Sequence, residues 1–249
     1  MKKILLILFA VGATALAHEP NPKLPEEFEH VQSQKSREVA GPILSKLLLK
    51  GPSAEGYAQL ASVFFDDSQP LPARFFYEMA IGLDSENKAY QESYQKVVDQ
   101  VAYLDQRFLH FVNLSQKEDK VTHFASMATI KFHMGFRAEG LQVLRDAIRV
   151  HGEDQRIFPL IGTFKHQIMA DRQTVQLLNS DLDQAILRGE VEKAAGIAGQ
   201  MFFVTGGHPE MLSIIKRVNT IPGAKVHDES LAILEVLTQQ HPQAVAKEG

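Results

Sequence analysis

Residues 57–65 read Tyr-Ala-Gln-Leu-Ala-Ser-Val-Phe-Phe, and residues 73–83 read Ala-Arg-Phe-Phe-Tyr-Glu-Met-Ala-Ile-Gly-Leu. In both stretches, apolar or small residues recur at the three- and four-residue spacing of one helix face. The intervening residues 66–72 contain Pro70 and Pro72, which a helix accepts only in its first turn. The pattern predicts two antiparallel helices joined by a tight turn.

Residues 54–87 as a whole resemble a tetratricopeptide repeat, a helix–turn–helix unit of about 34 residues. The matching positions carry Tyr57, Leu60, Ala61, Phe64, Ala73 and Tyr77. A second copy begins 67 residues further on, about twice the family period, with Phe124, Met127, Ala128, Gly140, Leu144 and Ala147. This copy departs from the pattern at Lys131, where an aromatic residue is expected. The resemblance implies an all-α fold of antiparallel helix hairpins that stack into a right-handed solenoid.

The remaining sequence also has the periodicity of helices, and no stretch alternates like a half-buried strand. Residues 88–120 contain no glycine or proline, and they fit one long helix or a hairpin bent near Asp105. The hairpin preserves the repeat period, so it is the favoured interpretation. Pro42 is expected near the start of a helix. Further helices are predicted over residues 156–170, 175–187, 191–204, 211–218 and 230–240. The helix over 191–204 is rich in small residues, Ala194, Ala195, Ala198 and Gly199, which predict a close approach to another helix.

The N-terminus has the pattern of a secretory signal peptide. Lys2 and Lys3 precede an apolar run over residues 4–11, and small residues surround Ala17, after which cleavage is predicted. The domain plan is therefore a signal peptide at 1–17, a mobile segment at 18–36, a repeat domain at 37–240 and a tail at 241–249. The protein is expected to be exported, with the periplasm favoured over the extracellular space.

The composition narrows the classes of partner. The formal charge is −4, and it becomes −6 when Lys2 and Lys3 are removed, which argues against nucleic acid as a partner. No later segment approaches eighteen consecutive apolar residues, so no membrane span is expected in the mature chain. The sequence contains no cysteine, which excludes disulfide bonds and thiol nucleophiles.

The sequence offers no recognisable catalytic or metal-binding motif. His110, His123 and His133 lack the spacing of a helical ligand pair, and neither a zincin motif nor a nucleophile-elbow motif is present. The expectation is a protein that is not an enzyme and that uses no cofactor or metal.

The resemblance supplies the candidate binding residues. In tetratricopeptide-repeat proteins the outer side of each first helix lines a concave groove that holds a peptide or a helix. The corresponding positions here are Glu55, Ala58, Ser62, Phe65 and Asp66 in the first copy, and Thr122, Ala125, Thr129, Phe132 and His133 in the second. Phe65 and Phe132 are each expected either to contact a partner or to pack against a neighbouring repeat.

These observations predict an exported scaffold that binds a protein or peptide partner through its groove. The lysine and asparagine that clamp a terminal carboxylate in chaperone-binding members are missing, so an acidic C-terminal peptide is not the expected ligand. The alternatives are a small-molecule-binding protein associated with a transport system and a helical accessory protein of cell-envelope enzymes.

Overall fold

The computed structural model describes residues 30–118, 120–152 and 154–239, and its regular elements are all helical. The predicted signal peptide and C-terminal tail lie outside these residues. The elements are α1 (His30–Lys50), α2 (Ala54–Asp66), α3 (Pro70–Leu83), α4 (Lys88–Lys117), α5 (Val121–His133), α6 (Arg137–His151), α7 (Phe158–Leu187), α8 (Val191–Val204), α9 (Met211–Lys216), a 3-10 helix (Arg217–Thr220) and α10 (Asp228–Gln239).

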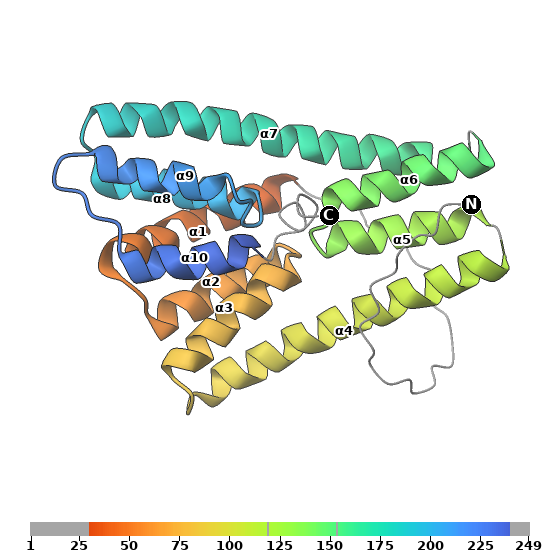
Figure 1. The fold of residues 1–249 in the computed structure, drawn as a ribbon, viewed down its shortest axis with the longest axis horizontal. Coiled ribbons are helices and arrows are strands. Elements are labelled where there is room, and N and C mark those ends of the chain that lie inside the picture. Colours follow the sequence, from red (N-terminus) through yellow and green to blue (C-terminus); the bar gives the residue numbers. More distant parts are fainter. Residues whose placement is uncertain (1–29, 119, 153, 240–249) are drawn as a thin grey trace.

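Consecutive helices pack in antiparallel pairs, and the chain also returns on itself. Figure 1 shows α4 and α7 along opposite edges of the molecule, with the α5/α6 hairpin between them at one end. At the other end α8 packs against both α7 and α1. The first and eighth helices are therefore neighbours, although residues 51–190 separate them in the sequence.

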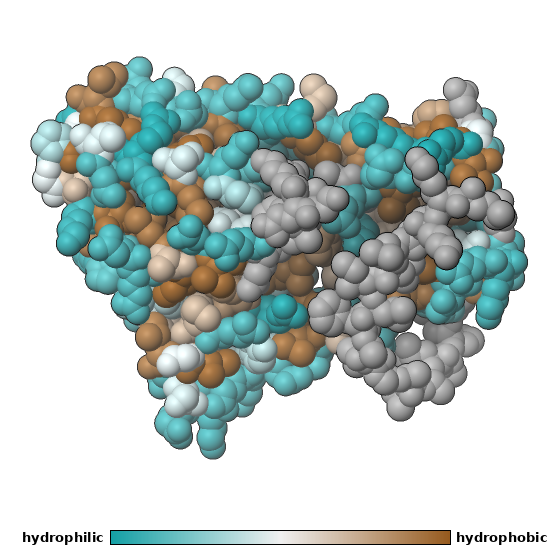
Figure 2. Space-filling model, viewed as in Figure 1, coloured by the Kyte–Doolittle hydropathy of each residue, from teal (hydrophilic) through white to brown (hydrophobic). Residues whose placement is uncertain are grey.

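The α2/α3 hairpin forms as its sequence predicts. Ser53 caps α2 by accepting a hydrogen bond from the Gly56 amide at 3.1 Å, and Pro70 occupies the first turn of α3. The apolar faces of both helices are buried, with Tyr57 and Phe76 stacked at a ring separation of 5.9 Å. Polar residues 84–87 form the turn before α4, which is visible as the hydrophilic tip in Figure 2.

An aromatic core joins this hairpin to α8. The Phe64 ring lies 5.5 Å from Phe76 and 4.7 Å from Phe203, and all three side chains are fully buried. Such ring pairs contribute about 0.5–1.5 kcal/mol each beyond the area that they bury. Phe203 shows that the hairpin is stabilised by a helix far along the chain.

The second hairpin, α5/α6, repeats the small-residue crossing of the first. Ala61 and Ala73 are both buried in α2/α3, and Ala128 and Gly140 take the equivalent places in α5/α6. A Cβ atom added at Gly140 would lie 2.8 Å from the Ala128 carbonyl oxygen, so the helices are too close there for a larger residue. The hairpin has its own apolar core, which includes Leu144, Ala147 and Phe164.

Lys131 occupies the position at which the repeat pattern has an aromatic residue, and its positive charge is paired. Its ammonium group lies 2.9 Å from a Glu139 carboxylate oxygen. The same group lies 4.9 Å from the Phe108 ring centre and 4.6 Å from that of Phe136, within range of a cation–π interaction. The lysine therefore fills an aromatic-lined space with its aliphatic stem and pairs its charge at the edge.

Small residues let α8 approach α1 closely, as the run Ala194, Ala195, Ala198 and Gly199 predicts. A Cβ atom added at Gly199 would lie 2.7 Å from the Leu44 Cβ atom, and one added at Gly41 would lie 2.9 Å from the Gly196 carbonyl oxygen. Glycine is required on both sides of this crossing.

Three predicted boundaries are wrong. Residues 88–117 form the single helix α4 and not a hairpin bent at Asp105, because no helix-breaking residue interrupts them. Residues 158–187 likewise form one helix, α7, through the polar stretch 171–174. Pro42 lies inside α1 rather than near the start of a helix. Helix α1 begins at His30, so residues 30–36 of the predicted segment 18–36 are helical.

Candidate functional site

The predicted groove residues on α2 and α5 differ widely in accessibility. Glu55, Asp66 and Thr122 are exposed. Five others are half-buried: Ser62, Phe65, Ala125, Thr129 and His133. Ala58 and Phe132 are buried.

Phe132 is part of the core around α5, α6 and α7. Its side chain is 3% exposed, its ring stacks on Phe164 at 4.0 Å, and the Arg137 guanidinium lies 5.6 Å from the ring centre. Of the two expectations for Phe132, the structure shows packing against a neighbouring helix.

Phe65 and His133, one from each predicted copy, line the same small cavity. This α4 cavity has a volume of about 290 Å³ and is lined by Phe65, Ser68, Pro70, Gln100, Leu104 and His133. Burial lowers the pKa of His133, which favours the neutral imidazole near pH 7. The two hairpins thus bring predicted groove residues together across the middle of α4.

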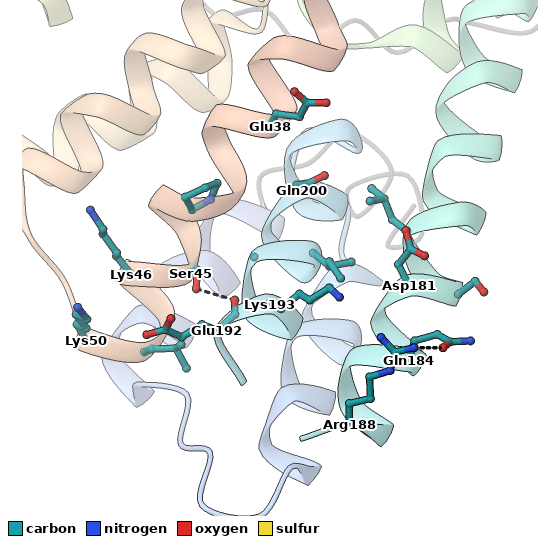
Figure 3. A pocket seen from close by; sticks show the side chains of 16 residues that line it. Glu38, Ser45, Lys46, Lys50, Asp181, Gln184, Arg188, Glu192, Lys193 and Gln200 are labelled. Atoms are coloured by element: carbon teal, nitrogen blue, oxygen red, sulfur yellow. Dashed lines mark hydrogen bonds between the residues drawn. The ribbon is translucent and has the colours of Figure 1, made fainter. Parts of the chain in front are cut away.

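A larger groove lies elsewhere and was not predicted from the sequence. This α8 groove has a volume of about 1000 Å³ and runs along α8 between α1 and α7. Its polar and charged lining residues include those labelled in Figure 3, and its apolar lining residues are Pro42, Leu49, Leu178 and Ile197. Gly196, which has no side chain, forms part of its floor.

The charges of the α8 groove are separated along its length. Lys50, Arg188 and Lys193 lie toward the end where α1 and α7 finish and α8 begins, with Lys46 one turn earlier on α1. Glu192 is the acidic residue among them, and the Lys193 ammonium pairs with Glu190 at 3.0 Å. Glu38 lies at the opposite end, and Asp181 of α7 lies between the two ends, about level with Lys193. One end of the groove is therefore mainly basic and the other is acidic.

Pro42 adds a backbone acceptor to the acidic end. A proline inside a helix has no amide hydrogen for the carbonyl four residues earlier, which here belongs to Glu38. Both residues line the groove. The acidic end thus combines the Glu38 carboxylate with a backbone carbonyl group that lacks its usual helical donor.

A cluster of polar side chains links the two hairpins at the centre of the molecule. Arg137 at the start of α6 forms an ion pair with Asp171 of α7, and Gln167 donates a hydrogen bond to Asp171 at 3.0 Å. In the α2–α3 turn, Gln69 donates to Asp67 at 2.9 Å. Burial raises the pKa of the Asp67 carboxyl, although the nearby charge of Arg137 partly opposes this effect. The Arg137–Asp171 ion pair joins α6 to α7, and the charge of Arg137 also acts on Asp67 in the first hairpin.

The described residues contain no group of three or more histidine, aspartate or glutamate side chains arranged to hold a metal ion. Among the same residues, no helix combines the length and apolar character needed to cross a membrane.

Comparison of the sequence with models of known protein families finds no match, and comparison with curated proteins finds no relative. The structure defines the chain as an all-helical protein whose helices pack in sequential antiparallel pairs.

Proposed function

We propose that this protein is an exported, non-enzymatic scaffold that binds a segment of a partner protein in the α8 groove. The observation that carries the proposal is the open groove of about 1000 Å³ between α1 and α7. Export is proposed from the signal-peptide pattern of residues 1–17, and the periplasm is the favoured location.

The lining of the groove suits a peptide segment. Apolar side chains from three helices form its inner surface, and charged side chains surround them, which resembles the apolar centre and polar rim of protein interfaces. Small-molecule sites enclose most of the ligand surface, whereas this groove is partly open to solvent.

The architecture supports a related proposal about the repeats. The α2/α3 and α5/α6 hairpins have the same crossing of small residues and similar lengths, so we regard them as tetratricopeptide-like units. The groove of about 1000 Å³ lies along α1, α7 and α8, outside the first helices of these two hairpins. We accordingly place partner binding at α1, α7 and α8.

A photo-crosslinking experiment tests the proposal. Because the chain contains no cysteine, Lys193→Cys provides one thiol in the groove for a benzophenone label. Lys165→Cys, on an exposed part of α7 away from the groove, provides the matched control. We expect the groove label to capture a discrete partner from cell-envelope extract that the control label does not capture. Identical capture by both labels would refute binding in the groove.

The α4 cavity supports a second candidate function, binding of a small apolar molecule, as in a transport-associated protein. Its volume of about 290 Å³ is close to the lower limit of ligand pockets, roughly 300 Å³. The chain contains no tryptophan, so Gln100→Trp would place a single fluorescent reporter in the cavity. Saturable quenching by a small aromatic compound such as indole, abolished by Leu104→Lys, would favour this function over the scaffold. An accessory role beside cell-envelope enzymes is compatible with the scaffold proposal.

A further inference from the structure

We infer that the α8 groove binds one amphipathic helix of the partner, about three turns long and antiparallel to α8. The N-terminus of this helix lies at Glu38, and its C-terminus lies at Lys50, Arg188 and Lys193. The inference rests on the proposed function and adds the form and the direction of the bound segment.

The shape of the groove favours a helix. Helices α1 and α7 run parallel to each other on either side of α8, which runs in the opposite direction between them. Gly196 lowers the floor, and small residues at a helix contact allow close approach of the axes. The distance along α1 from Glu38 to Lys50 corresponds to about 18 Å of helix, or three turns. One apolar stripe on the bound helix would contact Pro42, Leu178 and Ile197 together.

The backbone hydrogen bonds also favour a helix over an extended peptide. An extended peptide usually binds by adding to an exposed sheet edge, and the described residues contain no strand. A helix satisfies its own backbone groups except at its ends. The bound segment therefore requires polar partners mainly at the two ends of the groove, where the charged residues lie.

The charges determine the direction. The first turn of a helix has free amide donors and a partial positive charge, and the last turn has free carbonyls and a partial negative charge. The acidic end offers the Glu38 carboxylate, and Pro42 leaves the Glu38 carbonyl without its helical donor. The basic end offers Lys50, Arg188 and Lys193. The opposite direction would place amide donors against cations.

Two synthetic peptides of fourteen residues, about three to four turns, test the inference. Both carry leucines along one helical face. The forward peptide has lysines in its first turn and glutamates in its last turn, and the reversed peptide has these charges exchanged. The reversed peptide is the better isolated helix, because its charges match its own dipole. We nevertheless expect the forward peptide to bind about tenfold more tightly, since its charges and its dipole both match the groove.

Variants of the protein locate the binding. Gly196→Gln should abolish binding of the forward peptide, because its side chain would occupy the floor, where an added Cβ has no neighbour closer than 4.0 Å. Gly162→Gln, at an open position of α7 outside the groove, should leave binding unchanged. Circular dichroism of both variants verifies that they are folded.

Disulfide formation reports the direction, since a disulfide needs Cα atoms within about 7 Å. A forward peptide with a C-terminal cysteine should crosslink to Lys50→Cys and not to Glu38→Cys. Two results would overturn the inferred direction and leave the proposed function standing. The first is preferential crosslinking of this peptide to Glu38→Cys. The second is equal affinity of the two peptides, with binding still blocked by Gly196→Gln. If neither peptide binds the wild-type protein, both the inferred direction and the proposed function are overturned.

Discussion

The close crossing of α1 and α8 makes a quantitative prediction about Gly199. Replacing a helical glycine with alanine normally stabilises a helix by about 0.5–1 kcal/mol. At Gly199, however, the added methyl group would lie 2.7 Å from the Leu44 Cβ and 3.3 Å from the Gly41 carbonyl oxygen. Neither atom can move away by rotation of a side chain, so the two helices must separate.

The expected cost follows from the general effect of overpacking a core, which is about 1–3 kcal/mol. After the gain in helix propensity is subtracted, Gly199→Ala should be about 1 kcal/mol less stable than the wild type. Gly162→Ala is the matched control, because Gly162 lies inside α7 with no atom within 4 Å of an added Cβ. That variant should gain about 0.5–1 kcal/mol.

Urea unfolding followed by circular dichroism measures both variants. The expected difference in unfolding free energy between them is about 2 kcal/mol, with the same dependence on urea concentration. If Gly199→Ala were as stable as Gly162→Ala, the close packing of α8 against α1 would be wrong, and so would the position of the groove that it forms.

Arg137→Met should lower the unfolding free energy by about 3 kcal/mol, because it removes the guanidinium partner of the largely buried Asp171. Recovery of the urea midpoint in the double variant Arg137→Met/Asp171→Leu would verify this cause. An unchanged urea midpoint in Arg137→Met alone would contradict it. Asp67→Asn should stabilise the protein at neutral pH, since burial raises the carboxyl pKa above 3.8 and the native state thus disfavours the ionised form. This gain should disappear as the pH falls below 3.8 in a series of thermal unfolding curves, and a gain that persists there would exclude ionisation as the cause. Burial, with a smaller effect from Glu229, raises the pKa of Tyr57 from 10.0 to about 12, so its contribution to stability should be lost as the pH rises through this interval. Denaturant midpoints on either side of pH 10 should show this loss in the wild type and a smaller loss in Tyr57→Phe.

The sequence was sufficient to predict structure where local periodicity and turn residues agree. Tyr57, Phe64 and Phe76 share the buried side of one hairpin because their spacing matches a helix and two prolines mark the turn. Helix α8 was predicted over its full length, and its small residues indicated a close helix contact. These features depend on neighbours in the sequence, and helical geometry determines them directly.

The predictions failed where the local sequence permitted two structures. Asp105 and the polar residues 171–174 are compatible with both a turn and an exposed helical turn. In the structure, the pairing of Asp171 with Arg137 shows why a polar residue belongs inside α7. Phe132 was ambiguous for a similar reason, because only the position of Phe164 in another helix determines which way its side chain packs.

The α8 groove could not be predicted from the sequence because its two sides come from helices that are far apart in the chain. Pro42 on α1 and Leu178 on α7 line the same groove only after α8 has packed between these two helices. The glycines of that packing also shape the groove, since Gly41 and Gly199 set the distance of α1 from α8 and Gly196 sets the depth of the floor. Stability and binding should therefore be coupled at this crossing. A methyl group at Gly199 that moves α1 away from α8 should weaken binding of the forward peptide even under conditions in which the variant is fully folded.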